Sequence, residues 1–189
     1  EKKPLSNYGK NKLEIENYLK KMGYMHKFKS ISFRYFNAAG ADKSGKLGED
    51  HDPETHLIPS ILKSIKSKKN KFYIYGNNYK TKDGTCVRDY IHVNDIVSAH
   101  LEGLKKFKSK NCALNYNIGS GQGYSILEII KAVEKVTKTK IQLIYKNKRK
   151  GDPAALIANC DKIYKDLRWK PRYQNIHKII SSAWKWHNR

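Results

Sequence analysis

The feature that most constrains the fold of this chain is the alternation of two kinds of segment along its whole length. Short runs rich in aromatic and β-branched residues, typical of strands, are followed by longer runs with apolar residues at helical spacing. The predicted strands are 30–36, 72–75, 87–93, 114–118 and 141–145. The predicted helices are 8–23, 56–67, 94–106, 125–136, 161–167 and 174–187. Because strands and helices alternate, the sequence predicts an α/β fold rather than a helix bundle.

Local signals mark the ends of some predicted elements. Ser125 and Glu128 have the spacing of a capping box at the start of one helix, and Asn94 or Asp95 is expected to cap another. The segment 37–54 is rich in Gly, Asp and Ser and is too long for a simple connection. Loops of this length are usually functional or disordered, so this segment is a candidate for either.

A glycine-rich segment at 119–123 lies between a predicted strand and a predicted helix, where a dinucleotide-binding loop would be expected. The third glycine of G-x-G-x-x-G would fall at position 124, which is Tyr124, and no acidic residue follows at the required distance. We therefore interpret this segment as a glycine turn before a capped helix.

The first motif that suggests chemistry is Tyr8-x-x-x-Lys12. Residues four apart share one face of a helix, so both side chains can enter the same cleft. An ammonium group ~4 Å from a phenolate is worth about 4 kcal/mol at an effective dielectric of ~20, which favours the ionised, proton-accepting form of the tyrosine. The motif alone leaves two interpretations open, a catalytic pair and a surface helix with an amphipathic tyrosine.

A formal net charge of +22 invites a polyanion-binding interpretation. Of the 39 Lys and Arg residues, however, only six are arginine, whereas specific phosphate and base recognition relies on the arginine fork. The lysines are spread along the chain, and no zinc-finger or RNP pattern is present. We interpret the charge mainly as solvated surface, with a nucleic-acid site or attraction to a phosphorylated substrate as alternatives.

Cysteines, histidines and hydropathy restrict the class of protein further. Cys86, Cys112 and Cys160 are scattered and odd in number, so free thiols in a reducing cytoplasm are expected. No apolar run approaches the ~20 residues of a membrane span. No metal site is expected, because six of the seven histidines show no metal-ligand spacing: His26, His51, His92, His100, His177 and His187.

Six segments in order along the chain, together with the ending Ala183–Trp186, are similar to one enzyme family. The segments are Tyr8–Lys12, Arg34–Gly40 (RYFNAAG), Gly48–Pro59 (GEDHDPETHLIP), Asp83–Val93 (DGTCVRDYIHV), Tyr116–Gly121 and Arg149–Asp152. They resemble the C-terminal half of the UDP-glucose 4-epimerases, which are extended short-chain dehydrogenases/reductases. The resemblance implies a Rossmann-type fold with a smaller α/β substrate-binding domain, the cofactor NAD, a UDP-sugar substrate and a cytoplasmic homodimer.

The resemblance also implies roles for individual residues. Tyr8 would exchange a proton with the sugar 4-hydroxyl, and Lys12 would assist Tyr8 and bind the nicotinamide ribose. Phe36 corresponds to a residue that contacts the cofactor. Residues expected to contact the nucleotide sugar are Asn37, His56 and Leu57 near the sugar, Tyr73, Ile74 and Tyr75 along the uracil, Arg88 and Arg149 on the diphosphate, and Asp152 on the uridine ribose.

Leu156 occupies a position that helps to set the space for the sugar 2-substituent in this family. It is often tyrosine in glucose-specific members, so some activity on UDP-N-acetylglucosamine is expected here.

The resemblance further predicts how the chain is divided. Residues 1–36 would belong to the NAD-binding domain, and 37–189 mainly to the substrate-binding domain, with residues around 83–118 returning to the first. The glycine-rich loop of the family would lie before residue 1, so residues 1–189 alone are expected to expose an apolar face and to be inactive. The alternatives are a related enzyme acting on UDP-N-acetylglucosamine or UDP-glucuronate, as an epimerase or decarboxylase, and a basic non-catalytic polyanion-binding remnant.

Overall fold

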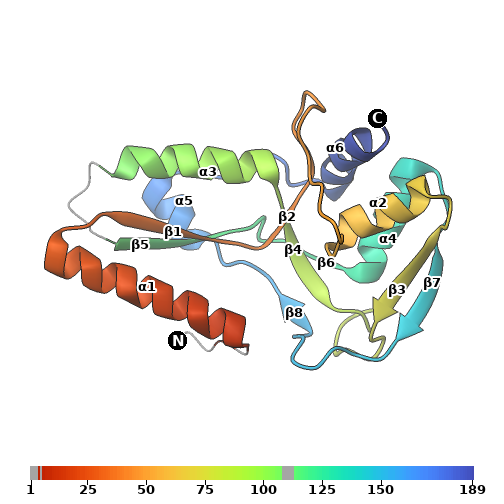
Figure 1. Ribbon diagram of the computed structural model, residues 1–189, viewed down its shortest axis with the longest axis horizontal. Coiled ribbons are helices and arrows are strands. Elements are labelled where there is room, and N and C mark those ends of the chain that lie inside the picture. Colours follow the sequence, from red (N-terminus) through yellow and green to blue (C-terminus); the bar gives the residue numbers. More distant parts are fainter. Residues whose placement is uncertain (1–3, 5, 108–112) are drawn as a thin grey trace.

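Two lobes lie next to each other along the long axis of the molecule (Figure 1). The computed structural model describes residues 4, 6–107 and 113–189, so the predicted free thiol Cys112 lies outside the described residues. The helices are α1 (Asn7–His26), α2 (Leu57–Lys66), α3 (Val93–Lys106), α4 (Ile126–Thr137), α5 (Asp161–Leu167) and α6 (Ile176–His187). The strands are β1 (Ser30–Tyr35), β2 (Asn37–Ala39), β3 (Lys71–Tyr75), β4 (Val87–His92), β5 (Ala113–Ile118), β6 (Gly123–Ser125), β7 (Gln142–Lys146) and β8 (Ala155–Leu156).

The prediction of an α/β fold is confirmed, and every predicted element is present with its ends within three residues of the expected positions. Three short strands, β2, β6 and β8, were not predicted. All three pair with β4: β2 and β8 run parallel to it, and β6 runs antiparallel. Strands of two or three residues carry too little alternation to be recognised from sequence.

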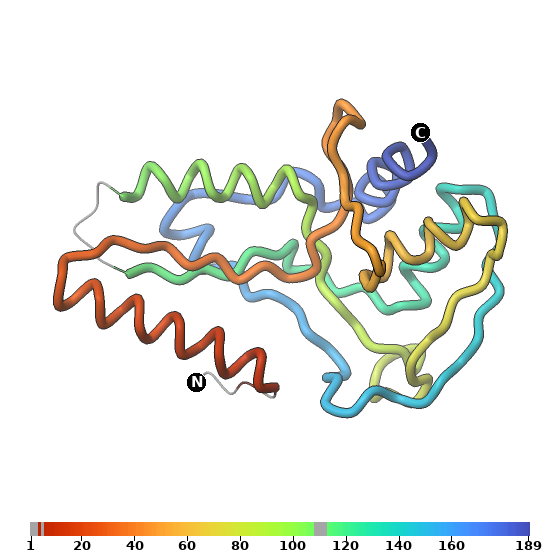
Figure 2. Tube along the Cα trace, viewed as in Figure 1, coloured from red at the N-terminus to blue at the C-terminus, as the bar shows by residue number. Residues whose placement is uncertain are grey.

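The first lobe is built around β1 and β5, which pair in parallel from Ser30 opposite Ala113 to Tyr35 opposite Ile118. Side chains alternate across the strand. Ile31 and Phe33 of β1 face α3, where Gly103 leaves room for the Phe33 ring. Arg34 faces α1 and forms a salt bridge with the buried Glu16. The tube trace shows α1 along one side of this strand pair and α3 along the other (Figure 2).

The second lobe contains the larger hydrophobic core. Helices α2, α4 and α6 pack together, and β3 pairs in parallel with β7 beside them. Ile61, Leu62, Ile129 and Ile180 are almost completely buried in this core. Burying a side chain of this size contributes about 1.5–3 kcal/mol, so this cluster anchors the loops that begin and end at α2.

Helix caps agree with the sequence in one case and differ in another. The Ser125–Glu128 capping box of α4 is present, with both reciprocal hydrogen bonds. The prediction that Asn94 or Asp95 caps α3 is wrong: His92 is the N-cap, and its ring nitrogen accepts from the Asn94 N–H. Asp95 is instead buried, and accepts the backbone N–H groups of residues 172 and 173. Tertiary contacts therefore override the local preference of Asp95 for the cap.

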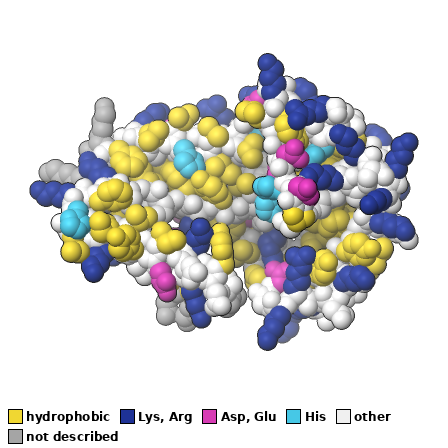
Figure 3. All heavy atoms as spheres, viewed as in Figure 1, with side chains coloured by type: hydrophobic (Ala, Val, Ile, Leu, Met, Phe, Trp, Pro, Cys, Tyr) yellow, Lys and Arg dark blue, Asp and Glu magenta, His cyan; other side chains and the backbone are white. Residues whose placement is uncertain are grey.

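Large apolar side chains are exposed along α1, in agreement with the apolar face expected from the resemblance, and also along α3. The space-filling view shows them gathered over the first lobe (Figure 3). They are Tyr8, Ile15, Tyr18, Tyr24 and Met25 on α1, and Val97, Leu101 and Leu104 on α3. Among the described residues, no helix is long and apolar enough to cross a membrane.

Candidate active site

The predicted catalytic pair lies at the start of α1. Ser6 caps this helix by accepting the Gly9 N–H at 3.1 Å, which fixes the first turn. One turn later, Lys12 Nζ lies 5.3 Å from the centroid of the Tyr8 ring, so the pair shares a face as predicted. Both side chains line a hollow of about 660 Å³ that also includes Arg34 and Tyr35. Tyr8 is 73% exposed, so its phenol is open to a ligand in this hollow.

Three hollows adjoin one another, because each shares lining residues with the next. The Tyr8–Lys12 hollow shares Tyr35 with a second hollow of about 810 Å³. The second shares Asn37, Leu57 and Tyr90 with a third of about 630 Å³. Each has the size of a typical small-molecule site. Together they extend from Tyr8 and Lys12, past the carboxyl ends of β1 and β2, to β3 and β4, which is where open α/β sheets bind ligands.

The third hollow, which we call the nucleotide cavity, collects most of the predicted substrate-binding residues. Its lining includes Asn37, Leu57, Tyr73, Tyr75, Arg88, Arg149 and Asp152. The Arg149 guanidinium stacks 4.1 Å from the centroid of the Tyr75 ring, and Lys146 Nζ lies 5.4 Å from that of Tyr73. The cavity therefore offers two aromatic faces with cations beside them, a combination suited to a flat base attached to phosphates.

Arg88 and Asp152 form a salt bridge in the wall of the nucleotide cavity. Arg88 Nη1 also donates to the carbonyl oxygens of Val87 at 2.8 Å and Pro153 at 2.9 Å, so its guanidinium is held in place. The Tyr79 hydroxyl donates to Asp152 Oδ2 at 3.5 Å. The resemblance implied separate roles for these residues, Arg88 on the diphosphate and Asp152 on the uridine ribose. It did not indicate that the two side chains pair with each other.

Four predicted residues do not line the nucleotide cavity. Ile74 is fully buried in the core of the second lobe, so only its backbone can face the cavity. His56 lines the second hollow rather than the nucleotide cavity. Leu156 is exposed on β8, directly opposite Arg88 in the sheet register. Phe36 also lines the second hollow, where its N–H donates to the Ile118 carbonyl at 3.0 Å.

Burial sets the protonation of two groups in the cavity wall. It raises the pKa of the Cys86 thiol above its usual range, and Arg88 only partly offsets this shift. It also raises the pKa of the Tyr90 phenol well above 10. Both groups are therefore neutral at pH 7, and neither acts as a nucleophile or base there. Cys86 and Cys160 are buried free thiols, as the sequence predicted.

The glycine-rich segment 119–123 is a turn, as interpreted from the sequence. The Ser120 N–H donates to Asp89 Oδ1 at 2.8 Å, and the Gly121 N–H donates to Asp89 Oδ2 at 2.9 Å. Because these amides already bind a buried carboxylate, they are not available to a dinucleotide phosphate.

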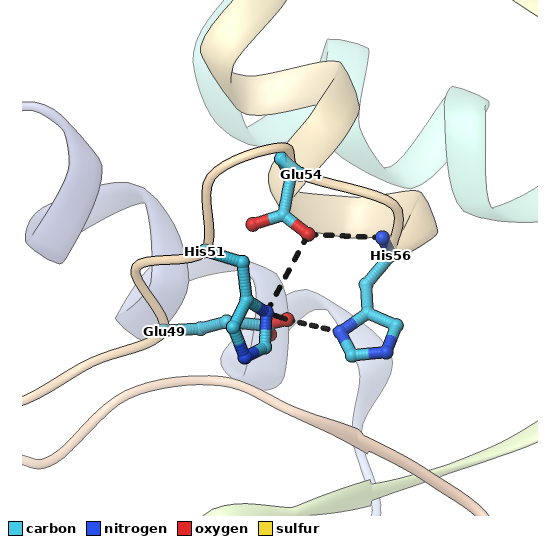
Figure 4. Close-up of side chains that lie close together, drawn as sticks. All are labelled: Glu49, His51, Glu54 and His56. Atoms are coloured by element: carbon cyan, nitrogen blue, oxygen red, sulfur yellow. Dashed lines mark hydrogen bonds and ion pairs between the residues drawn. The ribbon is translucent and has the colours of Figure 1, made fainter.

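A second cluster was missed from the sequence. Glu49, His51, Glu54 and His56 converge in the loop before α2 (Figure 4). Their pattern, Glu-x-His-x-x-Glu-x-His, has no standard metal-ligand spacing, and the histidines were considered without the glutamates between them. Considering both residue types in this long loop would have found it.

Comparisons with known proteins agree with this geometry. A sequence model of the NAD dependent epimerase/dehydratase family matches residues 1–119. The chain is 44% identical over 184 residues to a UDP-glucose 4-epimerase from Lactobacillus helveticus, covering 97% of this chain and 56% of that protein. It thus spans about half the length of the curated relatives it matches.

Solved structures give the same result. One crystal structure of a UDP-glucose 4-epimerase aligns with a TM-score of 0.92 at 44% identity, over 100% of this chain and 57% of the other. The Bifidobacterium longum UDP-glucose 4-epimerase, solved with NAD+ and UDP, aligns with a TM-score of 0.89 at 37% identity, over 96% of this chain and 54% of that one. The chain belongs to the NAD dependent epimerase/dehydratase family.

Proposed function

We propose that this chain provides the proton-transfer pair and the nucleotide-sugar site of an NAD-dependent epimerase that interconverts UDP-glucose and UDP-galactose. One observation carries the proposal: the Tyr8–Lys12 hollow adjoins, through the second hollow, a cavity lined by three tyrosines, two arginines and an aspartate. A proton acceptor and a nucleotide-diphosphate site therefore belong to one continuous groove. The UDP-glucose 4-epimerases among its relatives support the same assignment.

The reaction needs a proton and a hydride to leave the sugar together and to return. Tyr8 takes the proton of the sugar 4-hydroxyl as hydride leaves C4, and gives it back when hydride returns to the opposite face of the 4-keto sugar. Lys12 lies on the same face of α1 and stabilises the phenolate by its charge. When bound, NAD supplies the two-electron acceptor that takes the hydride and gives it back.

The chain's own residues fit part of such a cofactor. The two hollows at the end of β1 are large enough for part of a dinucleotide, in which Phe36 would contact the cofactor and Lys12 would bind the nicotinamide ribose. Tyr8, Lys12 and Phe36 are the residues that would hold it.

The nucleotide cavity supplies the remaining roles. Tyr73 and Tyr75 provide faces for the uracil, and Ile74 contributes only backbone atoms. Arg149 and Arg88 bind the diphosphate, for which the guanidinium fork is well suited. Asp152 accepts the hydroxyl protons of the uridine ribose.

The residues near the sugar follow from the second hollow. The Asn37 amide donates to the Asp89 carbonyl at 2.8 Å, which orients this side chain at the junction of the two hollows. His56 and Leu57 complete the wall around the sugar. Leu156 leaves more space than a tyrosine would, so we propose some activity on UDP-N-acetylglucosamine.

Two measurements test the function. UDP binding to the purified chain by calorimetry is expected and should be retained in the variant Tyr8→Phe. Product analysis on UDP-glucose, UDP-N-acetylglucosamine and UDP-glucuronate with NAD should show 4-epimerisation by a protein that contains this chain together with a complete dinucleotide site. Removing the Tyr8 hydroxyl should lower kcat by at least about 100-fold, the scale of general acid–base catalysis. Unchanged turnover by Tyr8→Phe would contradict the proposal.

For residues 1–189 alone we expect nucleotide binding without turnover. Steeply salt-dependent DNA binding with no UDP binding would instead favour a polyanion-binding role.

Three further properties complete the proposal. The buried free thiols Cys86 and Cys160 suit a reducing cytoplasm. The exposed apolar side chains of α1 and α3 suit an assembled protein, which we propose to be a homodimer. Residues 1–36, together with the returning segment around 83–118, are assigned to the NAD-binding part, and the pairing of β5 with β1 supports this division.

A further inference from the structure

The loop that precedes α2 brings four potential metal-binding side chains to one point. The ligand atoms of Glu49, His51, Glu54 and His56 all lie within 4.8 Å of one another. Glu49 Oε1 lies 3.1 Å from His51 Nδ1 and also contacts His56 Nδ1. His51 Nδ1 is 3.8 Å from Glu54 Oε1. In the close-up, both imidazoles turn their Nδ1 side toward the carboxylates (Figure 4).

The loop that carries these side chains is tied to two helices. The Trp186 indole N–H of α6 donates to the Glu49 carbonyl at 3.0 Å. Lys63 Nζ of α2 donates to the His51 carbonyl at 2.7 Å. The His56 N–H donates to Glu54 Oε1 at 2.9 Å, which holds this carboxylate at the start of α2. These hydrogen bonds therefore hold in place the loop backbone that carries the four ligand atoms.

Burial differs between the two kinds of ligand in a way that suits a cation. The Glu54 and Glu49 side chains are only 6% and 17% exposed, whereas His51 and His56 are 55% and 60% exposed. Glu54 Oε2 is buried and receives no hydrogen bond from the described residues, and its nearest cation, Lys63 Nζ, is 3.7 Å away. A buried carboxylate oxygen without a hydrogen bond is energetically costly, so this site favours additional positive charge.

The chemistry of the four ligands selects the class of ion. Two imidazole nitrogens and two carboxylate oxygens match the ligands of Zn²⁺ and its neighbours, whereas Mg²⁺ and Ca²⁺ prefer oxygen alone. Tetrahedral bonds of ~2.0–2.2 Å place neighbouring ligand atoms roughly 3.3–3.6 Å apart. The distances of 3.1 and 3.8 Å from His51 Nδ1 to the two carboxylates bracket this range.

We propose that Glu49, His51, Glu54 and His56 form a binding site for one divalent transition-metal ion of the zinc class. The ion would bind Nδ1 of each imidazole, with the ring proton on Nε2. Because His51 and His56 also line the second hollow, the bound ion fixes the wall of the groove next to the proposed sugar site. No metal is needed for the proposed epimerisation, so the site is an addition to that function.

The test is metal binding by the tag-free chain, without NAD or a UDP-sugar. Calorimetric titration with ZnCl₂ should show one saturable site, and MgCl₂ should show none. Co²⁺ should give the visible bands of a four-coordinate complex. His51→Gln and His56→Gln, each at an exposed position, should weaken Zn²⁺ binding by at least about tenfold. His26→Gln, at an exposed histidine on α1, is the matched control and should leave binding unchanged.

Two outcomes would overturn the proposal. One is the absence of saturable Zn²⁺ binding at ~100 µM, at the weak end of biological metal sites. The other is unchanged Zn²⁺ affinity in both histidine variants, which would place the ion elsewhere, for example on cysteine thiols. If either single variant loses its helical circular dichroism, Glu49→Gln provides an independent ligand deletion. Because no sugar or cofactor is present, the result does not depend on the proposed epimerase function.

Discussion

Asp89 is the residue whose replacement should most clearly test how the nucleotide cavity is held together. Its carboxylate is completely buried in β4 and accepts four hydrogen bonds. Oδ1 accepts from the Ser120 N–H at 2.8 Å and the Ser120 hydroxyl at 2.6 Å. Oδ2 accepts from the N–H groups of Gly121 at 2.9 Å and Ala158 at 3.1 Å. One side chain therefore joins the turn after β5 to the segment after β8.

The substitution Asp89→Asn changes little in shape but halves the acceptor capacity. The amide oxygen keeps two of the four bonds as neutral bonds, which are weaker by about 1 kcal/mol each than bonds to a charged acceptor. The new NH₂ group faces the other donors, and at least one buried backbone N–H loses its acceptor at a cost of about 1–3 kcal/mol. The expected loss of unfolding free energy is therefore about 4 kcal/mol, a large share of the ~5–15 kcal/mol of a typical domain.

Urea unfolding followed by circular dichroism measures this loss. The control is Asp50→Asn, because the Asp50 side chain is exposed and its nearest cation, Lys63 Nζ, is 3.7 Å away. It should change stability by less than about 0.5 kcal/mol. A loss below about 1 kcal/mol in Asp89→Asn would refute the argument, since it would mean that the four bonds do not hold the turn.

Three other predictions concern the groove and the buried histidines. Arg149→Ala removes a guanidinium stacked on Tyr75 and should weaken UDP binding by about tenfold in calorimetry; an unchanged Kd contradicts its role. Leu156→Tyr should lower the ratio of kcat/KM for UDP-N-acetylglucosamine over UDP-glucose by at least about tenfold in the active protein; an unchanged ratio contradicts the proposed specificity. Burial lowers the pKa of His92 and His187. As the pH falls, these histidines are therefore protonated in the unfolded chain at a higher pH than in the folded chain. Stability should be full above about pH 6.5 and fall as the pH drops toward the folded-state values, so equal urea midpoints at about pH 7.5 and 5.5 would contradict this.

The order of elements could be predicted because each long element carries its own signal. Helix α4 shows both an amphipathic pattern and the Ser125–Glu128 capping box, and both are present in the structure. In contrast, β2, β6 and β8 have only two or three residues, and exist because β4 offers edges to which they can pair. Their positions follow from tertiary structure, so no local pattern contains them.

The candidate site was predictable at the level of residues but not of contacts. The nucleotide cavity includes Asn37, Arg88 and Asp152, as the motifs indicated. The pairing of Arg88 with Asp152 joins residues 64 positions apart, and it depends on the parallel pairing of β8 with β4. The cluster of Glu49, His51, Glu54 and His56 depends on the conformation of a loop. A loop has no sequence periodicity from which its conformation could be predicted.

Strand β4 shows how one short sequence builds both the cavity and its support. Alternate side chains of a strand point to opposite faces. Arg88 and Tyr90 therefore face the nucleotide cavity, while Asp89 between them points away, toward the Ser120–Gly121 turn and Ala158. A slip of one residue in register would place the carboxylate in the cavity and bury the guanidinium. The four hydrogen bonds of Asp89 fix this register, so the position of Arg88 in the cavity wall depends on a neighbour that lies outside the cavity.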